Sequence, residues 1–411
     1  MSHLRCRSCD APLRHSLVDL GMSPLANSYL KRDELQAMEP FYPLHAYVCE
    51  QCFLVQVPEF ASPERIFGDY AYFSSYADTW LEHVRAYAAQ AIERFGLGPD
   101  SLVIEVASND GCLLQGFKKS GIPVLGIEPA HNVAQFARDA GIPTVVTFLG
   151  AQAAAKLAAE GKRADLVVAN NVMAHVPDLK DFIAGMKILL KPNGVVTIEF
   201  THLRRMLEGN QFDAIYHEHF SYFSLIAAEK ALERHGLTVF DVEELPTHGG
   251  SLRLFVRHAD NSSNPVGPRV GKLRAAEAAA RYDRLEPYLS FAEKVRETKH
   301  SILDFFIGAK RQGKSIAGYG APAKGNTLLN YCGIRTDFID YTVDRSPHKQ
   351  GLFLPGTHIP IFSPDKIKET RPDYLVVLPW NLKNEIMQQT AYIRDWGGRF
   401  VTLIPDVAVE T

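Results

Sequence analysis

Short apolar runs alternate with helical segments through the middle of the chain. Four of these runs are rich in Val, Leu, Ile and Ala and fall at residues 101–106, 124–128, 164–169 and 194–200. Continuous apolar runs between helices are typical of parallel strands covered on both faces. Two further runs, 237–242 and 251–256, are separated by a Gly-rich turn and predict a hairpin at the sheet edge. A helix is expected over about 79–95, ahead of the first strand.

The same alternation returns near the C-terminus. It follows a charged, Ala-rich stretch over residues 268–309, whose spacing predicts one or two long connecting helices. Strands are then expected at 315–320, 338–343, 374–378 and 399–404. The predicted fold class is α/β, with a small N-terminal module over 1–66, a Rossmann-like domain over 67–265, a helical connector over 266–309 and a second Rossmann-like domain over 310–411.

Six cysteines add a metal to this picture. Two CxxC pairs predict a tetrahedral, four-thiolate zinc site formed by Cys6, Cys9, Cys49 and Cys52. A filled coordination shell would hold the fold and take no part in chemistry. Disulfides are the alternative, which the expected compartment disfavours. Residues 20–27, between the pairs, are rich in Gly, Pro and Asn and predict an irregular loop.

The composition excludes several classes of function. The 411 residues are 46% hydrophobic and 22% charged, as in an ordinary globular protein. A formal net charge of −3 argues against nucleic acid or anionic lipid as a partner. Neither a membrane-length apolar run nor a secretory segment occurs, so we expect a cytoplasmic protein with no membrane partner. No feature of the sequence indicates a protein partner.

The segment from Tyr216 to Tyr222 gathers two imidazoles, a carboxylate and two phenols in seven positions. Groups that move protons near neutral pH seldom cluster in this way without a chemical role. The spacing is not that of a helical metalloprotease motif. An extended segment would place His217 and His219 on one face and Glu218 on the other. A polar loop or a second metal site is the alternative.

The loop after the first strand is the expected cofactor site. Its small residues allow close approach of a ligand to a helix N-terminus, and Glu128 is placed to accept hydrogen bonds from ribose hydroxyls. Because no GxGxxG fingerprint is present, S-adenosylmethionine is favoured over NAD. An ordinary βα turn beside a surface Glu is the alternative. The predicted cofactor residues are Glu105, Ser108, Asn109, Asp110, Gly111, Glu128, Pro129, Asn170 and Asn171.

Three further features point to a substrate. The aromatic stretch 69–76 is either a packing arm or a phenol-lined lid over a sugar or base. Lys324, at a predicted strand-loop-helix turn, is a candidate diphosphate anchor, with a structural glycine loop as the alternative. Arg253 is a second candidate, although a strand charge is more often simply solvated. The predicted substrate ligands are Tyr72, Tyr222, Arg253, Lys324 and Asn326.

Together these motifs resemble the zinc-containing, S-adenosylmethionine-dependent C-methyltransferases that act on nucleotide-linked deoxysugars. The resemblance covers nearly the whole chain and rests on the two CxxC pairs and on residues 105–111, 126–129, 169–175, 216–222 and 318–326. It implies a class I methyltransferase domain in the centre. It also implies a 3-C-methyltransferase for a 4-keto-6-deoxyhexose carried on a nucleoside diphosphate, usually dTDP, bound between the central and C-terminal domains.

By matching position, the resemblance points to Tyr70, His175, Tyr216, Glu218 and His219 as active-site groups, and Tyr72 competes with Tyr70. The chemistry suits these residue types. A base must remove the proton α to the ketone, and His219 is the candidate. Tyr216 or His175 would stabilise the enolate oxygen. Glu218 would orient a His or hold a sugar substituent.

Three other functions are weighed against this one. A C-5 methyltransferase uses related chemistry on a similar ketosugar. An NAD-dependent sugar-nucleotide oxidoreductase or epimerase is opposed by the missing dinucleotide fingerprint at both glycine loops. A zinc-module protein that binds nucleic acid is opposed by the net charge and the absence of a basic stripe.

Overall fold

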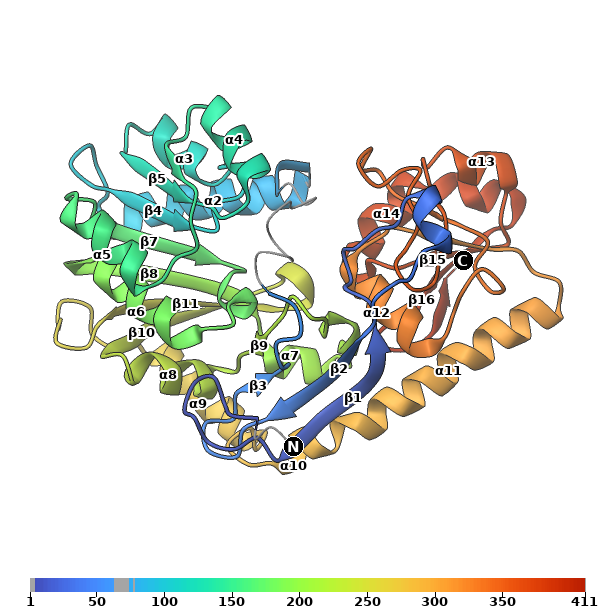
Figure 1. Ribbon diagram of the computed structural model, residues 1–411, viewed down its shortest axis with the longest axis horizontal. Coiled ribbons are helices and arrows are strands. Elements are labelled where there is room, and N and C mark those ends of the chain that lie inside the picture. The colour runs from blue at the N-terminus through green and yellow to red at the C-terminus, as the bar shows by residue number, and fades with distance from the viewer. Residues whose placement is uncertain (1–3, 63–73, 77, 411) are drawn as a thin grey trace.

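The computed structural model describes residues 4–62, 74–76 and 78–410. The predicted site residues Tyr70 and Tyr72 lie outside the described residues. Two α/β domains lie on opposite sides of the view in Figure 1, and the strands of the N-terminal module run between them.

The central domain is built on a seven-stranded sheet of order β10-β11-β8-β7-β4-β5-β6. The parallel strands form where apolar runs were predicted: β4 (Val103–Val106), β5 (Val124–Ile127), β7 (Ala164–Asn170) and β8 (Leu190–Thr201), with short β6 (Thr144–Val145) at the edge. The predicted hairpin is confirmed as antiparallel β10 (Leu237–Leu245) and β11 (Ser251–His258), which joins β8. This is the strand order of a class I methyltransferase domain.

Helices pack around this sheet. The long helix α2 (Asp78–Phe95) ends at Phe95, as the sequence predicts. The others are α3 (Leu114–Lys119), α4 (His131–Asp139), α5 (Ala151–Ala159), α6 (Leu179–Leu189), α7 (Leu203–Glu208) and α8 (Leu225–Glu233). Loops at the carboxyl ends of the parallel strands therefore share one edge of the sheet, where open α/β sheets bind ligands.

The N-terminal module is a small antiparallel sheet of order β1-β2-β3-β9. Its strands are β1 (His15–Ser23), β2 (Tyr42–Val48), β3 (Val55–Gln56) and β9 (Ser221–Tyr222). The prediction of a loop over residues 20–27 is wrong for residues 20–23, because β1 continues to Ser23 through a register shift between Asp19 and Met22. Gly21, with φ of 74°, lies in that irregular part. The fourth strand, β9, belongs to the central part of the chain, so the end of the Tyr216–Tyr222 segment completes the module's sheet.

The C-terminal domain has a six-stranded sheet of order β14-β13-β12-β15-β16-β17. Its strands are β12 (Ile316–Tyr319), β13 (Thr342–Val343), β14 (Ile361–Phe362), β15 (Tyr374–Val377), β16 (Arg399–Thr402) and β17 (Ala408–Glu410). The strand expected at 338–343 is limited to its last two residues, because a turn occupies residues 336–338. Helices are α12 (Ala323–Cys332), α13 (Lys366–Thr370) and α14 (Lys383–Gln389).

The connector consists of three helices, not one or two: α9 (Pro268–Ala279), α10 (Glu286–Leu289) and α11 (Phe291–Arg311). Helix α11 packs against both β1 and α12 (Figure 1). One hydrophobic core runs across all three parts and includes Leu17 of β1, Leu207 of α7, Phe306 of α11 and Leu328 of α12. Such a shared core holds the two α/β domains and the N-terminal sheet in one arrangement.

Candidate active site

Tyr216 to Tyr222 form a turn that leads into β9. The His219 N–H donates to the Tyr216 carbonyl at 2.9 Å, so the extended arrangement considered from the sequence is not formed. Pairing of β9 with β3 fixes the end of the segment and forces the chain to turn before it. His217 consequently contacts Tyr42 and the Pro43 carbonyl of the N-terminal module, at 3.2 Å from Nε2 to the carbonyl oxygen.

His219 and Tyr216 form a hydrogen-bonded pair. The His219 Nδ1 lies 2.8 Å from the Ala214 carbonyl oxygen, and Nε2 lies 2.8 Å from the Tyr216 hydroxyl. Because a carbonyl oxygen only accepts, Nδ1 carries the hydrogen, and Nε2 accepts from the phenol. Burial, with His175 nearby, holds the pKa of His219 well below its usual range. A neutral imidazole thus offers a basic nitrogen, and both side chains are half-buried.

Glu218 points away from this pair. Both carboxylate oxygens accept from the Asn27 amide, at 2.8 and 2.9 Å, so the side chain ties the turn to the N-terminal module. Burial raises the pKa of Glu218 to about 7. The structure places Glu218 as a support of the turn, next to the pair and outside hydrogen-bond contact with it.

The raised pKa of Glu218 predicts how the free energy of unfolding depends on pH. The folded chain keeps this proton up to about pH 7, whereas an unfolded chain releases it near the ordinary value of 4.5. The folded state then binds more protons, so the contribution of Glu218 to the free energy of unfolding falls as pH rises through that window. We expect Glu218→Gln to flatten this fall, measured as the thermal midpoint against pH for both chains. An identical pH profile in the variant would contradict the assignment.

His175 lies against the pair. It ends the short helix η3 (Met173–His175) after β7, and its ring meets the His219 ring edge-on with centroids 4.6 Å apart. Burial lowers the pKa of His175 to about 4, so this ring is also neutral. The structure therefore brings together Tyr216, His219 and His175, three of the predicted active-site groups.

The carboxyl edge of the sheet carries unpartnered polar atoms where the cofactor was expected. Among the described residues, Glu105 Oε2, Ser108 Oγ and both amide atoms of Asn170 are buried without a hydrogen-bond partner. Ala107, Asn109 and Gly111 have φ of 55°, 50° and 76°, so the loop after β4 is held in a left-handed conformation. Buried orphan acceptors and a strained loop at this edge fit a polar ligand such as S-adenosylmethionine.

Other predicted cofactor residues have partners within the chain. The Glu128 carboxylate accepts from the backbone N–H groups of Asn109 and Ala130, at 2.8 and 2.9 Å, which leaves lone pairs for ribose. Pro129 lies between Glu128 and Ala130 in the chain. Asp110 and Asn109 accept from Ser75 and Ser74 N–H groups of the short helix η2 (Ser74–Tyr76). A Cβ on Gly111 would lie 3.0 Å from Ile142, so packing as well as φ requires glycine here.

The predicted substrate ligands separate into two groups. Lys324, in the first turn of α12, is half-buried, donates to Asn381 at 3.0 Å and lies over the Trp380 ring. Burial lowers the pKa of Lys324, and Asp213 opposes that shift. Tyr222 is buried, and its hydroxyl accepts from the Tyr216 N–H at 3.3 Å.

Asn326 and Arg253 have partners within the chain that hold the fold. The Asn326 amide donates to the Ala26 carbonyl at 2.7 Å and fastens α12 to the N-terminal module. Arg253, predicted as a substrate ligand with a solvated strand charge as the alternative, is buried and pairs with Glu199 at 2.6 Å and with Glu243 at 3.3 Å. A buried guanidinium held by two carboxylates stabilises the sheet.

Sequence reasoning missed three residues at this site. Asp213, in η4 (Phe212–Ala214), accepts from the Trp380 indole at 2.7 Å across the two α/β domains. Burial raises the pKa of Asp213 to about 6. His248 lies beside Asn171, with Nε2 3.4 Å from the amide nitrogen. The His-Gly-Gly run at 248–250 is a sequence signal that could have drawn attention to His248. Asp213 and Trp380 carry no such signal, because they meet only through long-range packing.

The four predicted zinc ligands meet at one point. The sulfur atoms of Cys6, Cys9, Cys49 and Cys52 lie within 4.8 Å of one another, as one tetrahedral ion requires. Gln56 supports them, because its amide donates to Cys6 Sγ at 3.3 Å while its carbonyl oxygen accepts from the Arg7 N–H. A donor aimed at a sulfur atom suits a metal-bound thiolate. These residues would hold Zn²⁺ in a closed shell.

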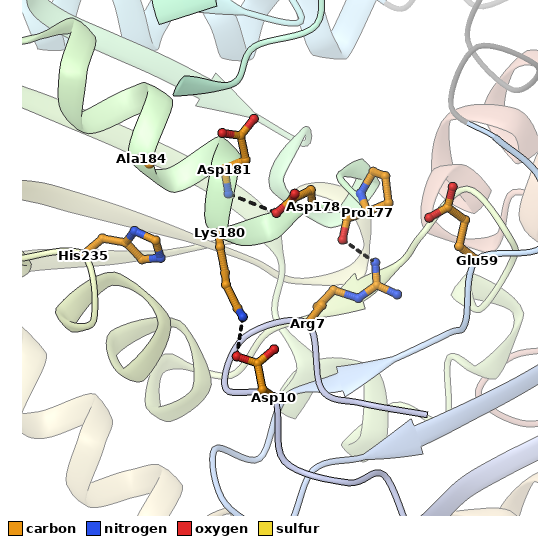
Figure 2. A pocket seen from close by; sticks show the side chains of 9 residues that line it. All are labelled: Arg7, Asp10, Glu59, Pro177, Asp178, Lys180, Asp181, Ala184 and His235. Carbon is orange, nitrogen blue, oxygen red and sulfur yellow. Dashed lines mark hydrogen bonds and ion pairs between the residues drawn. The ribbon is translucent and has the colours of Figure 1, made fainter. Parts of the chain in front are cut away.

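Arg7, inside the first CxxC pair, links the zinc knuckle to the active site. Its guanidinium donates to the Val57 carbonyl at 2.6 Å and to the Pro177 carbonyl at 3.1 Å. Pro177 lies two residues after His175. Figure 2 shows this contact in an open depression between the knuckle and α6, and Tyr216 and His219 are not among the residues that line it.

Three family models match the chain. A zinc binding domain covers residues 6–67, a methyltransferase domain covers 80–242, and a C-methyltransferase C-terminal domain covers 246–405. Among the described residues, no helix has both the length and the apolarity needed to cross a bilayer.

Known proteins agree with these matches. The C-methyltransferase NovU of Streptomyces niveus is 36% identical over 404 residues, which is 98% of this chain and 96% of the relative. A ubiquinone biosynthesis O-methyltransferase of Methylobacterium sp. (strain 4-46) is 28% identical over 28% of this chain and 48% of its own. The solved 1,6-didemethyltoxoflavin-N1-methyltransferase of Burkholderia thailandensis is 19% identical over 52% of this chain and 98% of its own, with a TM-score of 0.37.

The alignment with NovU thus spans the four-cysteine module, the class I sheet and the C-terminal domain of this chain. S-adenosylmethionine and zinc are the cofactors that these parts carry. The chain belongs to the zinc-binding, S-adenosylmethionine-dependent C-methyltransferases.

Proposed function

We propose that this enzyme methylates C-3 of a 4-keto-6-deoxyhexose carried on a nucleoside diphosphate, with dTDP as the expected carrier. The observation that carries the proposal is the Tyr216–His219 hydrogen bond of 2.8 Å beside the carboxyl edge of the sheet. Methyl transfer to carbon needs a carbanion, and a ketone makes the adjacent C–H acidic enough for a side-chain base. Bound S-adenosylmethionine supplies an electrophilic methyl group, so the protein's own task is to form and orient the nucleophile.

The pair acts as one base. The Tyr216 oxygen takes the proton from C-3 while the phenol proton passes to His219 Nε2, whose Nδ1–H stays on the Ala214 carbonyl. His219 becomes an imidazolium that the Ala214 carbonyl stabilises. The enolate oxygen at C-4 needs a donor, and His175, whose ring meets the His219 ring, is the proposed one.

The other end of the substrate would lie toward the C-terminal domain. Lys324 and the backbone N–H groups of the first turn of α12 offer positive charge and donors for a diphosphate. The Trp380 ring lies under Lys324, and its indole donates to Asp213, just before the Tyr216–Tyr222 segment. The sugar ring would then lie between α12 and the cofactor edge.

The proposal is tested with a panel of nucleotide-linked 4-ketosugars and methyl-labelled S-adenosylmethionine. We expect label in the sugar product, a mass gain of one methyl group, and an NMR position at C-3. A methyl group at C-5 would correct the position while keeping the chemistry. No transfer to any ketosugar of the panel would overturn the proposed substrate class.

A further inference from the structure

We infer that His248 is a sugar-binding residue of this site and donates a hydrogen bond through its ring to an oxygen of the hexose; the assignment rests on the proposed function. His248 lies in η5 (Thr247–Gly249), the turn between β10 and β11. That turn shares the sheet edge with the loop that carries Asn171 and His175.

The backbone of His248 is held in an unfavourable conformation. Its φ is 54°, in the left-handed region, and Gly249 and Gly250 follow with φ of 90° and 121°. A non-glycine residue keeps such a conformation only where its surroundings enforce it, and such residues cluster at functional sites.

Contacts on both sides enforce it. Thr247 donates to Glu199 at 3.1 Å, and Gln211 donates to the Gly249 carbonyl at 2.9 Å. A Cβ on Gly249 would lie 2.4 Å from the Trp380 ring, so this turn is packed directly against the C-terminal domain. The turn thus holds His248 beside the contact between the two domains, close enough to Lys324 for its charge to act on the imidazole.

The ring of His248 is oriented as a donor. The Asn171 amide nitrogen lies 3.4 Å from His248 Nε2, and an amide NH₂ only donates, so Nε2 accepts and Nδ1 carries the hydrogen. Within the described residues, no hydrogen-bond partner of Nδ1 is found. The Trp80 ring of α2 packs on the imidazole, with centroids 5.6 Å apart, and limits its rotation.

The charge state selects the ligand. Burial, with Lys324 nearby, lowers the pKa of His248 to about 4, so the ring is neutral. A neutral donor suits a sugar hydroxyl or ketone oxygen, whereas a diphosphate would be matched by the cationic Lys324. His248 contacts Asn171 at the cofactor edge, and the next residue, Gly249, packs on Trp380, whose ring lies under Lys324. The proposed substrate would place its hexose between these two points.

The test is His248→Gly in the full chain. Glycine accepts this φ without strain, so the variant should fold and its thermal midpoint should stay the same or rise. We expect the KM for the nucleotide-linked ketosugar to rise about tenfold, the effect of losing one hydrogen bond. The Kd for S-adenosylhomocysteine, measured by calorimetry, should not change. His248→Asn, a short donor that tolerates the left-handed region, should recover part of the loss.

Arg371→Gly is the matched control, because Arg371 has φ of 47°, is exposed and lies at the end of α13. Wild-type KM and kcat in His248→Gly would overturn the inference, as would an equal loss of S-adenosylhomocysteine affinity, which would mean that His248 acts through Asn171. Wild-type transfer to a ketosugar is measured first. If the wild type transfers nothing, the proposed function fails and the inference with it; if only the variant comparison fails, the function stands.

Discussion

Replacing His219 with asparagine is expected to lower kcat for methyl transfer by about 10²- to 10⁴-fold, the usual contribution of a positioned general base. Asparagine fills similar space but has no basic nitrogen to receive the Tyr216 proton. The 2.8 Å hydrogen bond that links the two side chains is then lost as a proton route. Steady-state transfer of labelled methyl groups to the ketosugar measures the effect.

His217→Asn is the matched control, because His217 lies in the same turn and bonds the Pro43 carbonyl. It should lower the thermal midpoint while kcat stays within about tenfold of wild type, since the buried imidazole supports the turn only. Comparable loss of kcat in both variants, with comparable loss of stability, would show that the His219 effect is structural.

Removal of zinc is expected to lower the rate of methyl transfer by about 10²-fold or more while S-adenosylhomocysteine still binds. Structural zinc contributes about 10 kcal/mol or more to the folding of small modules, so the N-terminal sheet should loosen without it. That sheet holds β9, bonds Glu218 through Asn27 and fixes Pro177 through Arg7. Displacement of the catalytic groups by about 1 Å is enough to cost roughly 10²-fold in rate.

Hydrogen exchange after chelation of the zinc measures directly how the zinc module holds the 216–222 segment. The N–H groups of Val57 and of the 219–222 segment should exchange faster in the metal-free chain, and added zinc should restore both protection and rate. Cys332→Ala is the control, because Cys332 is a buried cysteine outside the cluster and should keep zinc and activity. A metal-free chain with full rate and unchanged protection would refute a scaffolding role for the module.

The sheets and the metal ligands were within reach of the sequence because they depend on local patterns. Apolar runs of five to seven residues mark β4, β5, β7 and β8, and two CxxC pairs bring their own sulfur atoms together. The hairpin of β10 and β11 also follows from neighbouring residues.

What the sequence did not predict depends on contacts between distant segments. Pairing of β9 with β3 turns the catalytic segment, so His217 and His219 face different parts of the molecule. The Asp213–Trp380 contact spans 167 positions, and the buried Arg253–Glu199 pair spans 54. No periodicity along one strand or helix carries that information.

The most direct test of the account is proton exchange at the α carbon of a 3-deuterated nucleotide-linked 4-ketosugar, with S-adenosylhomocysteine in place of the methyl donor. NMR follows the loss of deuterium to water under conditions where no methyl group can be transferred. We predict steady exchange with the wild type and exchange at least about 10²-fold slower with His219→Asn. Equal exchange rates in the two chains would contradict the Tyr216–His219 pair as the base.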